Sequence, residues 1–468
     1  MTTALAVDLG SSSGRVVAGR LEGDHIEIHE VHRFSHEAIR RDGSLVWDLE
    51  RLWDQTVEGL QKAVQEYPDA QSVSVDTWGV DFVALDSDDH PVGPPRAYRD
   101  ERTARTLEQF RQRIDDEEFF HLTGIAPATI NTANQLVALT REEPELAEHI
   151  DTVLLLPDYF AWKLSGVKGW SRSICSSSGL CEPGSPRWSD TVFSRLGLPR
   201  SWVGDLNDDL TTVGPCTVEG LESLTVVRGG AHDTACAVHG LPVEEGVKAY
   251  FLSCGSWSVL GGMLDRPLLT DAAFKLGLTN ESRSDGGVRP LFNITGMWIL
   301  QELQRQWERE GMPTDTDELV AAARTCAPSA HLFDPDDPRF AEPGEMVEKI
   351  DTVIREAGGE PPSTKPEYVR LVIESFAQRY ARGIDELAQI AGSRPDQLNL
   401  VGGGARNHLL CDLTAQAAQL RVVAGPIEAS ILGSLIAQLE IMGNIASGDR
   451  PHIIATTAKT RVHEPSAR

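Results

Sequence analysis

The strongest constraint on the fold of this chain is a pattern that occurs twice: a β-hairpin closed by a turn of glycine and serine. Ala4 to Leu9 alternate as a strand, Gly10 to Gly14 form the turn, and Arg15 to Leu21 return as a second strand. Near the middle of the chain, Lys248 to Ser253 and Trp257 to Met263 are joined by a similar turn. The repetition indicates an internal duplication.

Further elements follow each hairpin in the order expected of an α/β fold. In the first half we expect a third strand at His25 to Val31, a helix that Asp48 caps, and a buried strand at Gln71 to Trp78. In the second half a long amphipathic helix, Tyr368 to Ile390, leads into a strand at Leu398 to Val401.

The length of 468 residues predicts two or three domains. A boundary between Pro242 and Val247 separates a predicted N-terminal domain, residues 1–243, from a predicted C-terminal domain, residues 244–468. The region from Ala327 to Pro366 is rich in proline and acidic residues and predicts loops between helices.

Composition limits the partners of the chain. There are 70 acidic residues against 43 Lys and Arg, and the net charge of -27 would repel nucleic acid and anionic membrane surfaces. No apolar run is long enough to span a bilayer, no export signal is visible, and the seven cysteines form no C-x-x-C pair. We therefore expect a cytoplasmic protein with a small-molecule partner.

The first turn follows Asp8 and suits an anion. Backbone N–H groups of Ser11, Ser12, Ser13 and Gly14 would cradle a phosphate, and Asp8 could hold a hydrated cation. The run also matches the G-x-S-x-G elbow of serine hydrolases, but that motif needs a helix after the serine and a strand follows here. By itself, the turn is more typical of an ordinary hairpin.

Two other glycine-rich segments could approach a nucleotide. The second hairpin turn contains Ser256, and a triple glycine, Gly402, Gly403 and Gly404, follows a predicted strand. Neither matches the dinucleotide-binding G-x-G-x-x-G motif, and the chain contains no Gly-Lys pair, so it lacks the phosphate-binding P-loop. A tight strand-to-helix turn remains an alternative for the triple glycine.

Acidic residues with neighbouring aromatic residues are candidates for sugar chemistry. Asp233 could take a proton from a substrate hydroxyl, although its position before a helix is more typical of an N-cap, and His232 alone is more often structural. The segments Asp76 to Asp81 and Tyr98 to Arg102 resemble a sugar site, or a surface loop with a buried tryptophan.

Taken together, the motifs resemble the FGGY family of carbohydrate kinases, and within it the L-rhamnulose kinases. The ordered motifs are VDLGSSSGR from Val7, DTWGVDFVALD from Asp76, AYRDERT from Ala97, LLPDYFAWKLSG from Leu155, HDTACAV from His232, GSWS from Gly255, NITGMWILQ from Asn293, VGGGARN from Val401 and AGPIEAS from Ala424.

This resemblance implies two actin-like (ribonuclease H-like) α/β domains with ATP and a ketose in the cleft between them. It implies that Asp233 is the general base for the C1 hydroxyl of L-rhamnulose and that Asp8 helps to hold Mg²⁺ through water. The other implied contacts are Ser11, Ser12, Ser13, Gly14, Arg15 and Ser256 for the phosphates, Gln301, Gly402, Gly403, Gly404 and Asn407 for the nucleotide, and Gly79, His232, Thr234 and Asn293 for the sugar.

The chain departs from the wider family in three places. Ser11 and Ser256 stand where relatives carry threonine, which keeps a hydroxyl, and the segment from Ser171 to Leu180 is rich in serine where relatives carry threonine.

The alternative functions are a kinase for L-fuculose or D-xylulose, an actin-like ATPase module, and a sugar sensor without catalysis. A sensor should lack Asp233 or the phosphate turns. The sequence is compatible with a monomer or a homodimer.

Overall fold

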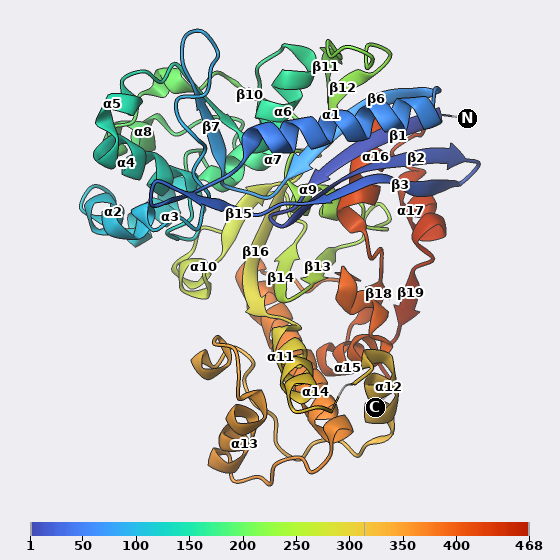
Figure 1. Cartoon of the computed structure of the whole chain (residues 1–468). Helices are drawn as coiled ribbons and strands as arrows, with labels where there is room; N and C mark the ends of the chain where they lie inside the picture. Colours follow the sequence, from blue (N-terminus) through green and yellow to red (C-terminus); the bar gives the residue numbers. More distant parts are fainter. Residues whose placement is uncertain (1, 313, 467–468) are drawn as a thin grey trace. The chain divides into compact units, whose positions relative to one another are not determined.

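Each half of the chain is built on a mixed β-sheet, as seen in a computed structural model that describes residues 2–312 and 314–466 (Figure 1). The strands of the first half are β1 (Thr2–Leu9), β2 (Ser13–Glu22), β3 (His25–Ser35), β4 (Ile39–Arg41), β5 (Ser44–Val46), β6 (Ala70–Thr77), β7 (Phe82–Leu85), β8 (Thr152–Leu155), β9 (Trp170–Ser171), β10 (Leu206–Asn207), β11 (Thr211–Pro215) and β12 (Thr225–Arg228). Those of the second half are β13 (Ala249–Cys254), β14 (Trp257–Gly262), β15 (Thr279–Ser282), β16 (Val288–Thr295), β17 (Gln397–Val401), β18 (Arg421–Ala424) and β19 (Arg461–His463).

The helices follow the same division along the chain. In the first half they are α1 (Leu49–Glu66), α2 (Arg102–Arg111), α3 (Asp116–Thr123), α4 (Thr132–Glu142), α5 (Pro144–Ala147), α6 (Leu156–Ser165), α7 (Arg172–Cys175), α8 (Asp190–Leu196) and α9 (Asp233–His239). In the second half they are α10 (Asp271–Leu276), α11 (Trp298–Arg309), α12 (Thr316–Thr325), α13 (Met346–Glu356), α14 (Lys365–Ala391), α15 (His408–Ala418), α16 (Ala429–Ile441) and α17 (Arg450–Ala458).

The chain forms two units. Unit 1 comprises the chain up to Pro242 together with Leu264–Pro290 and Ala429–Thr457, and unit 2 comprises Val243–Met263, Leu291–Glu428 and the residues from Ala458 onward. The first change of unit falls at the predicted boundary. A contiguous division into 1–243 and 244–468 nevertheless misses the two later segments that return to unit 1, because such returns are set by tertiary packing.

The two sheets share one topology. The sheet of the first half has the order β3-β2-β1-β6-β12-β11, and that of the second half has the order β15-β16-β14-β13-β17-β18-β19, in which β15 is an additional edge strand. Apart from β15, the first three strands of each sheet are antiparallel, the next two are parallel to the central strand, and the last is antiparallel again. The internal duplication that the two hairpins indicated is therefore present throughout both sheets.

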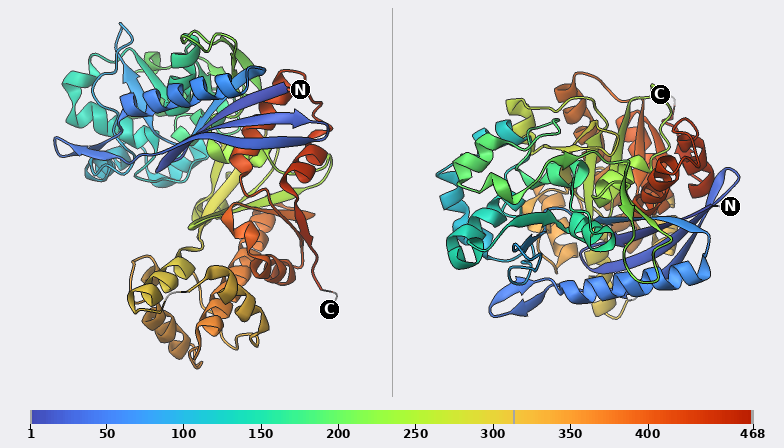
Figure 2. Two further views of the ribbon diagram at one scale, coloured as in Figure 1. Left: turned by 45° about the vertical axis from the view of Figure 1, so that its right-hand side comes forward. Right: turned by 90° about the horizontal axis from the view of Figure 1, so that it is seen from above.

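Helices cover both faces of the unit 1 sheet. Val16 lies against α1, where a Cβ on Gly59 would meet it, whereas Gly19, three residues on, faces Leu435 of α16. Residues an odd number apart on a strand face opposite sides, so α1 and α16 lie on opposite faces. The views in Figure 2 agree: α1 runs along the blue strands, and the red helices of the chain's last part lie against the same strands.

Local signals explain α1 and the strands that flank it. The carboxylate of Asp48 accepts a hydrogen bond from the backbone N–H of Arg51, as expected of an N-cap, and Leu52, Leu60 and Ala63 are buried on one face. Burial of each leucine contributes about 1.5–3 kcal/mol. The prediction of loops from Ala327 to Pro366 is partly wrong, since α13 lies within that region and buries Met346 and Ile350.

In the described part of the chain, no helix combines the length and the apolar character that crossing a bilayer requires.

Candidate active site

The turn between β1 and β2 is ordered by its own backbone and by the segment after β3. The N–H of Gly10 donates to the carbonyl of Ser13 at 2.9 Å, and the N–H of His36 donates to the carbonyl of Ser12 at 3.1 Å. Ser11 and Ser12 are exposed, and their N–H groups donate to no other group among the described residues. Such N–H groups in a tight turn are available to an anion.

In the structure Asp8 forms an ion pair with Arg15. The sequence predicted that Asp8 holds a cation and that Arg15 binds phosphate. The two residues lie opposite each other on β1 and β2. Nη2 and Nε of Arg15 donate to Oδ2 of Asp8 at 2.7 and 3.0 Å. These hydrogen bonds hold the guanidinium of Arg15 next to the turn between β1 and β2.

Asp76 lies beside Asp8 in the parallel register of β1 and β6, so both side chains project from the same face. It is fully buried, and burial followed by the negative charges of Asp8 and Asp233 raises its pKa well above the ordinary value. The neighbouring Ser434 lowers the pKa of Asp76 in part. Neither the hydroxyl of Ser434 nor the carboxyl group of Asp76 makes a hydrogen bond of good geometry among the described residues.

An unpaired buried carboxylate is costly, and carboxylate oxygens are the ligands that Mg²⁺ prefers. The adjacent carboxyl groups of Asp8 and Asp76 therefore fit a divalent cation. In the sequence, Asp76 belongs to a segment that resembles a sugar site, and its pairing with Asp8 was not predicted. Its position at the end of a buried strand beside β1 was the available signal.

His232 and Asp233 stand at the start of α9, next to the end of β6. A β-bridge joins Thr77 to His232, and Nε2 of His232 lies 3.7 Å from Oδ1 of Asp233. The hydroxyl of Thr234 donates to the same oxygen at 3.0 Å. The interpretation of Asp233 as the N-cap is wrong, because His232 occupies that position and Asp233 is the first helical residue, with its side chain 39% exposed.

The imidazole of His232 lies so close to position 79 that only glycine fits there. A Cβ at position 79 would lie 2.7 Å from Nε2 of His232 and 3.6 Å from Oγ of Ser177. The absence of a side chain thus leaves the imidazole room beside the loop. Three of the four residues predicted to contact the sugar, Gly79, His232 and Thr234, therefore lie together with Asp233.

Asp81 has a structural role. Its Oδ2 accepts hydrogen bonds from the indole nitrogens of Trp47 at 2.6 Å and Trp78 at 2.8 Å, and these rings lie 4.5 Å apart. Burial raises the pKa of Asp81 to about 6, against the lowering effect of these hydrogen bonds. Trp78 is buried, as one of the two interpretations of this segment predicted, but Asp76 and Thr77 lie in β6 and not in a surface loop. A contact of this segment with a sugar through Gly79 stays a prediction.

The serine-rich segment is buried beside Gly79 and is bonded to two carboxylates. Asp158 accepts a hydrogen bond from the hydroxyl of Ser171 at 2.5 Å, and Asp209 accepts one from Ser173 at 2.8 Å. Burial raises the pKa of Asp158 to about 7 and that of Asp209 to about 6. These hydrogen bonds therefore fix the serine-rich segment next to the loop that contains Gly79.

In unit 2 the second glycine-serine turn is held in a comparable way. The N–H groups of Met297 and Trp298, where α11 begins, donate to the carbonyls of Gly255 and Ser256 at 2.8 and 3.2 Å. The exposed hydroxyl of Ser256 donates to Oε1 of Gln301 at 3.0 Å. Two residues predicted to bind the nucleotide are thus in direct contact.

A cavity of about 280 Å³ opens beside this turn within unit 2. It is lined by Cys254, Gly255, Met297, Leu300, Gln301, Gln304, Thr316, Leu319, Val320, Val369, Gly403, Gly404 and Asn407. Its walls are largely apolar, with a few amide groups that can select an orientation. This combination is typical of a site for a small molecule.

The triple glycine shapes one wall of that cavity. Gly402 has a φ of +78°, and a Cβ on Gly404 would lie 2.4 Å from the sulfur of Cys254. Oδ1 of Asn407 accepts a hydrogen bond from the N–H of Leu410 at 3.1 Å and caps α15. Asn293 is exposed on β16 and does not line this cavity.

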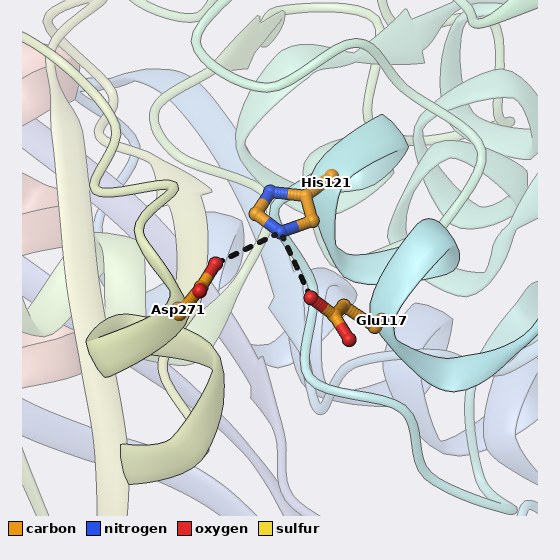
Figure 3. Close-up of side chains that lie close together, drawn as sticks. All are labelled: Glu117, His121 and Asp271. Atoms are coloured by element: carbon orange, nitrogen blue, oxygen red, sulfur yellow. Dashed lines mark ion pairs between the residues drawn. The ribbon is translucent and has the colours of Figure 1, made fainter.

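A separate group of side chains in unit 1 has the spacing of metal ligands. Figure 3 shows Nε2 of His121 directed at Glu117, one turn earlier on α3, and at Asp271 of α10, with separations of 4.0 and 3.7 Å. All three side chains are exposed. Exposed ion pairs contribute little stability, and nothing else marks this group as a ligand site.

Comparison with known proteins decides the family. The model of the FGGY family of carbohydrate kinases, N-terminal domain, matches residues 3–240, and that of the C-terminal domain matches residues 250–440. The chain belongs to the FGGY family of carbohydrate kinases. It is therefore a carbohydrate kinase, and kinases of this family use ATP with a divalent metal.

Solved structures share the fold of this FGGY kinase at low sequence identity. A xylulose kinase from Rhodospirillum rubrum is 18% identical with a TM-score of 0.81, over 99% of this chain and 94% of that one. Glycerol kinase from Plasmodium falciparum, solved with ADP, is 13% identical with a TM-score of 0.81, over 100% and 94%. A ligand-bound xylulose kinase from Lactobacillus acidophilus is 14% identical with a TM-score of 0.79, over the same shares. The predicted two-domain actin-like α/β fold is confirmed.

Proposed function

We propose that this kinase transfers the terminal phosphoryl group of ATP to the 1-hydroxyl of L-rhamnulose. The observation that carries the proposal is the grouping of Asp233, His232, Thr234 and Gly79 around the start of α9, beside the turn that Asp8 and Arg15 support. It matches the set of motifs by which the sequence resembles the L-rhamnulose kinases.

In this proposal Asp233 acts as the general base. Its carboxylate accepts the proton of the ketose C1 hydroxyl as that oxygen attacks the terminal phosphorus, and ADP leaves with the electrons of the broken P–O bond. Thr234 holds one carboxylate oxygen through its hydroxyl at 3.0 Å, which orients the base. The partial exposure of the carboxylate leaves it accessible to a substrate.

The remaining predicted residues divide between binding tasks. The N–H groups of the first turn and Arg15 would bind phosphate, and Ser256, Gln301, the triple glycine and Asn407 would bind the nucleotide. Asp8 and Asp76 would hold Mg²⁺, directly or through water. When bound, the ion supplies positive charge that neutralises the phosphates. We further propose that the protein acts in the cytoplasm in L-rhamnose breakdown.

The first prediction concerns Asp233→Asn. The amide cannot accept the hydroxyl proton, so kcat should fall by at least 10²-fold, as expected for loss of a general base, while the Kd for ATP stays within about twofold. A coupled ADP-release assay with L-rhamnulose, L-fuculose and D-xylulose measures the first quantity, and calorimetry measures the second.

A matched control separates catalysis from helix stability. Asp190 is the first residue of α8, as Asp233 is of α9, so Asp190→Asn removes the same charge from the same helical position. It should leave turnover unchanged. Retained turnover in Asp233→Asn would remove Asp233 from the base role. Preference for another ketose would replace the substrate, and ketose binding without ADP release would favour a sensor.

A further inference from the structure

A buried ion pair lies behind His232 in unit 1. Arg289 of β16 is fully buried and Glu281 of β15 is nearly so. Nη2 and Nε of Arg289 donate to Oε2 of Glu281 at 2.5 and 3.2 Å. Burial alone would raise the pKa of Glu281, but the charge of Arg289 and its hydrogen bonds to the carboxylate lower it to about 2. Both residues are therefore charged in the folded protein.

Stability gives little reason for such a pair, because desolvation of two buried charges offsets most of their attraction. Nη1 of Arg289 is also buried without a hydrogen-bond partner among the described residues. What distinguishes the pair is its neighbour. Nη2 of Arg289 lies 2.5 Å from Nδ1 of His232, and Oε2 of Glu281 lies 3.4 Å from the same nitrogen.

The contact with Arg289 decides where the proton of His232 sits. A guanidinium can only donate hydrogen bonds, and it does not lose its proton in proteins. At 2.5 Å, a proton on Nδ1 would place two N–H groups against each other. Nδ1 is therefore the acceptor, and the proton of the neutral ring is on Nε2.

Nε2 is the nitrogen that faces the site. It lies 3.7 Å from Oδ1 of Asp233 and next to the space left open at Gly79. The side chain of His232 is 10% exposed, so it is enclosed but part of it remains accessible. A hydrogen-bond donor is thus fixed beside the proposed general base.

We propose that Glu281 and Arg289 are positioning residues that hold His232 with its proton on Nε2, so that it donates a hydrogen bond to an oxygen of the ketose. The inference rests on the proposed function in assigning His232 to the sugar. The pair itself does not touch the substrate. It acts through His232, with Arg289 saturating Nδ1 and Glu281 holding Arg289 in place.

The test replaces Arg289 by methionine, which has a similar reach and no donor. In Arg289→Met, Nδ1 of His232 faces only the carboxylate of Glu281, so the proton should move to Nδ1 and Nε2 should lose its fixed donor role. The KM for the ketose should rise about tenfold or more, whereas the KM for ATP stays within about twofold, since one hydrogen bond to the sugar becomes a mismatch.

The tautomer is read directly by ¹⁵N NMR of protein labelled at the histidine ring nitrogens, with His232→Asn to assign the signals. The wild type should show an unprotonated Nδ1 and a protonated Nε2 in the absence of sugar. Arg289→Lys, which keeps a donor and a charge, should restore part of the ketose affinity.

Two further variants control for the loss of any arginine from this hairpin and for misfolding. Arg283→Met removes another arginine of the same hairpin, one that pairs with Asp285, and should change neither reading. If Arg289→Met leaves Glu281 unpaired and fails to fold, Glu281→Met with Arg289→Met removes both charges and leaves Nδ1 of His232 without a donor, so this double variant should show the same rise in KM.

The outcomes separate the two proposals. A protonated Nδ1 in the wild type, or an unchanged ketose KM in a folded variant without Arg289, overturns the positioning role. Wild-type turnover with a ketose other than L-rhamnulose overturns only the proposed substrate, since the KM comparison can be made with that ketose. A wild type inactive on every ketose overturns the proposed function, while the NMR measurement still tests the tautomer.

Discussion

The protonation of Asp158 should make the stability of unit 1 depend on pH. This carboxyl group is fully buried, and it accepts hydrogen bonds from the backbone N–H of Ser171 at 3.0 Å and from its hydroxyl at 2.5 Å. Burial outweighs these hydrogen bonds and raises its pKa from 3.8 to about 7. The folded state therefore binds a proton that the unfolded state releases above pH 4.

The sign and size of the effect follow from this difference. Because the folded-state pKa is raised, the contribution to stability is complete below pH 3.8 and is lost as the pH rises to about 7. A difference of about 3 pKa units corresponds to about 4 kcal/mol, of which about 3 kcal/mol should be lost between pH 5 and pH 8. Asp158→Asn mimics the protonated acid and should remove this term.

The measurement is urea-induced unfolding of the wild type and of Asp158→Asn at pH 5 and pH 8, followed by tryptophan fluorescence. Relative to the wild type, the variant should gain about 3 kcal/mol on going from pH 5 to pH 8. Asp81 titrates in the same window but is common to both proteins, so its contribution cancels in the difference. Asp209 also titrates there, and its contribution cancels only in part because its charge raises the pKa of Asp158. Asp54→Asn, on the exposed side of α1, is the control. A stability difference that is the same at both pH values would refute the reasoning.

Two other substitutions probe the site. Gly79→Ala places a Cβ 2.7 Å from Nε2 of His232, so the imidazole ring must move. The KM for the ketose should therefore rise at least tenfold, while the melting temperature changes by only a few degrees. An unchanged KM would show that His232 is not held against this loop. Asp76→Asn replaces a buried carboxyl group whose pKa is raised by burial and by Asp8, so without added metal the variant should melt at a higher temperature than the wild type at pH 8. Mg²⁺ should then stabilise the wild type more than the variant, and equal stabilisation would separate Asp76 from the cation.

Local features of the sequence were sufficient for much of the fold. The two hairpins, the Asp48 cap and the long helix α14 follow from alternation, turn chemistry and helical periodicity, all of which act over a few residues. The structure extends the first hairpin and α14 by one to three residues at their ends, shifts β13 by one residue and ends β14 one residue earlier than predicted.

What the sequence did not reveal depends on contacts between distant residues. The return of Leu264–Pro290 to unit 1 brings Glu281 and Arg289 to His232, about fifty residues away in the chain. Nothing near either residue marks it as part of a site. Likewise Asp81 resembles a sugar ligand in sequence, and only the two indoles that donate to it show its structural role.

The shared topology of the two sheets shows why the proposed tasks divide as they do. In unit 1 the register of the two central parallel strands pairs Asp8 with Asp76 at the edge next to the turn, whereas the equivalent register in unit 2 pairs Ser253 with Val401. Two adjacent carboxyl groups can hold a cation and raise each other's pKa. A hydroxyl beside an apolar side chain can do neither. The proposed division of tasks, with metal and proton chemistry in unit 1 and nucleotide binding in unit 2, therefore agrees with the difference between these two pairs of side chains.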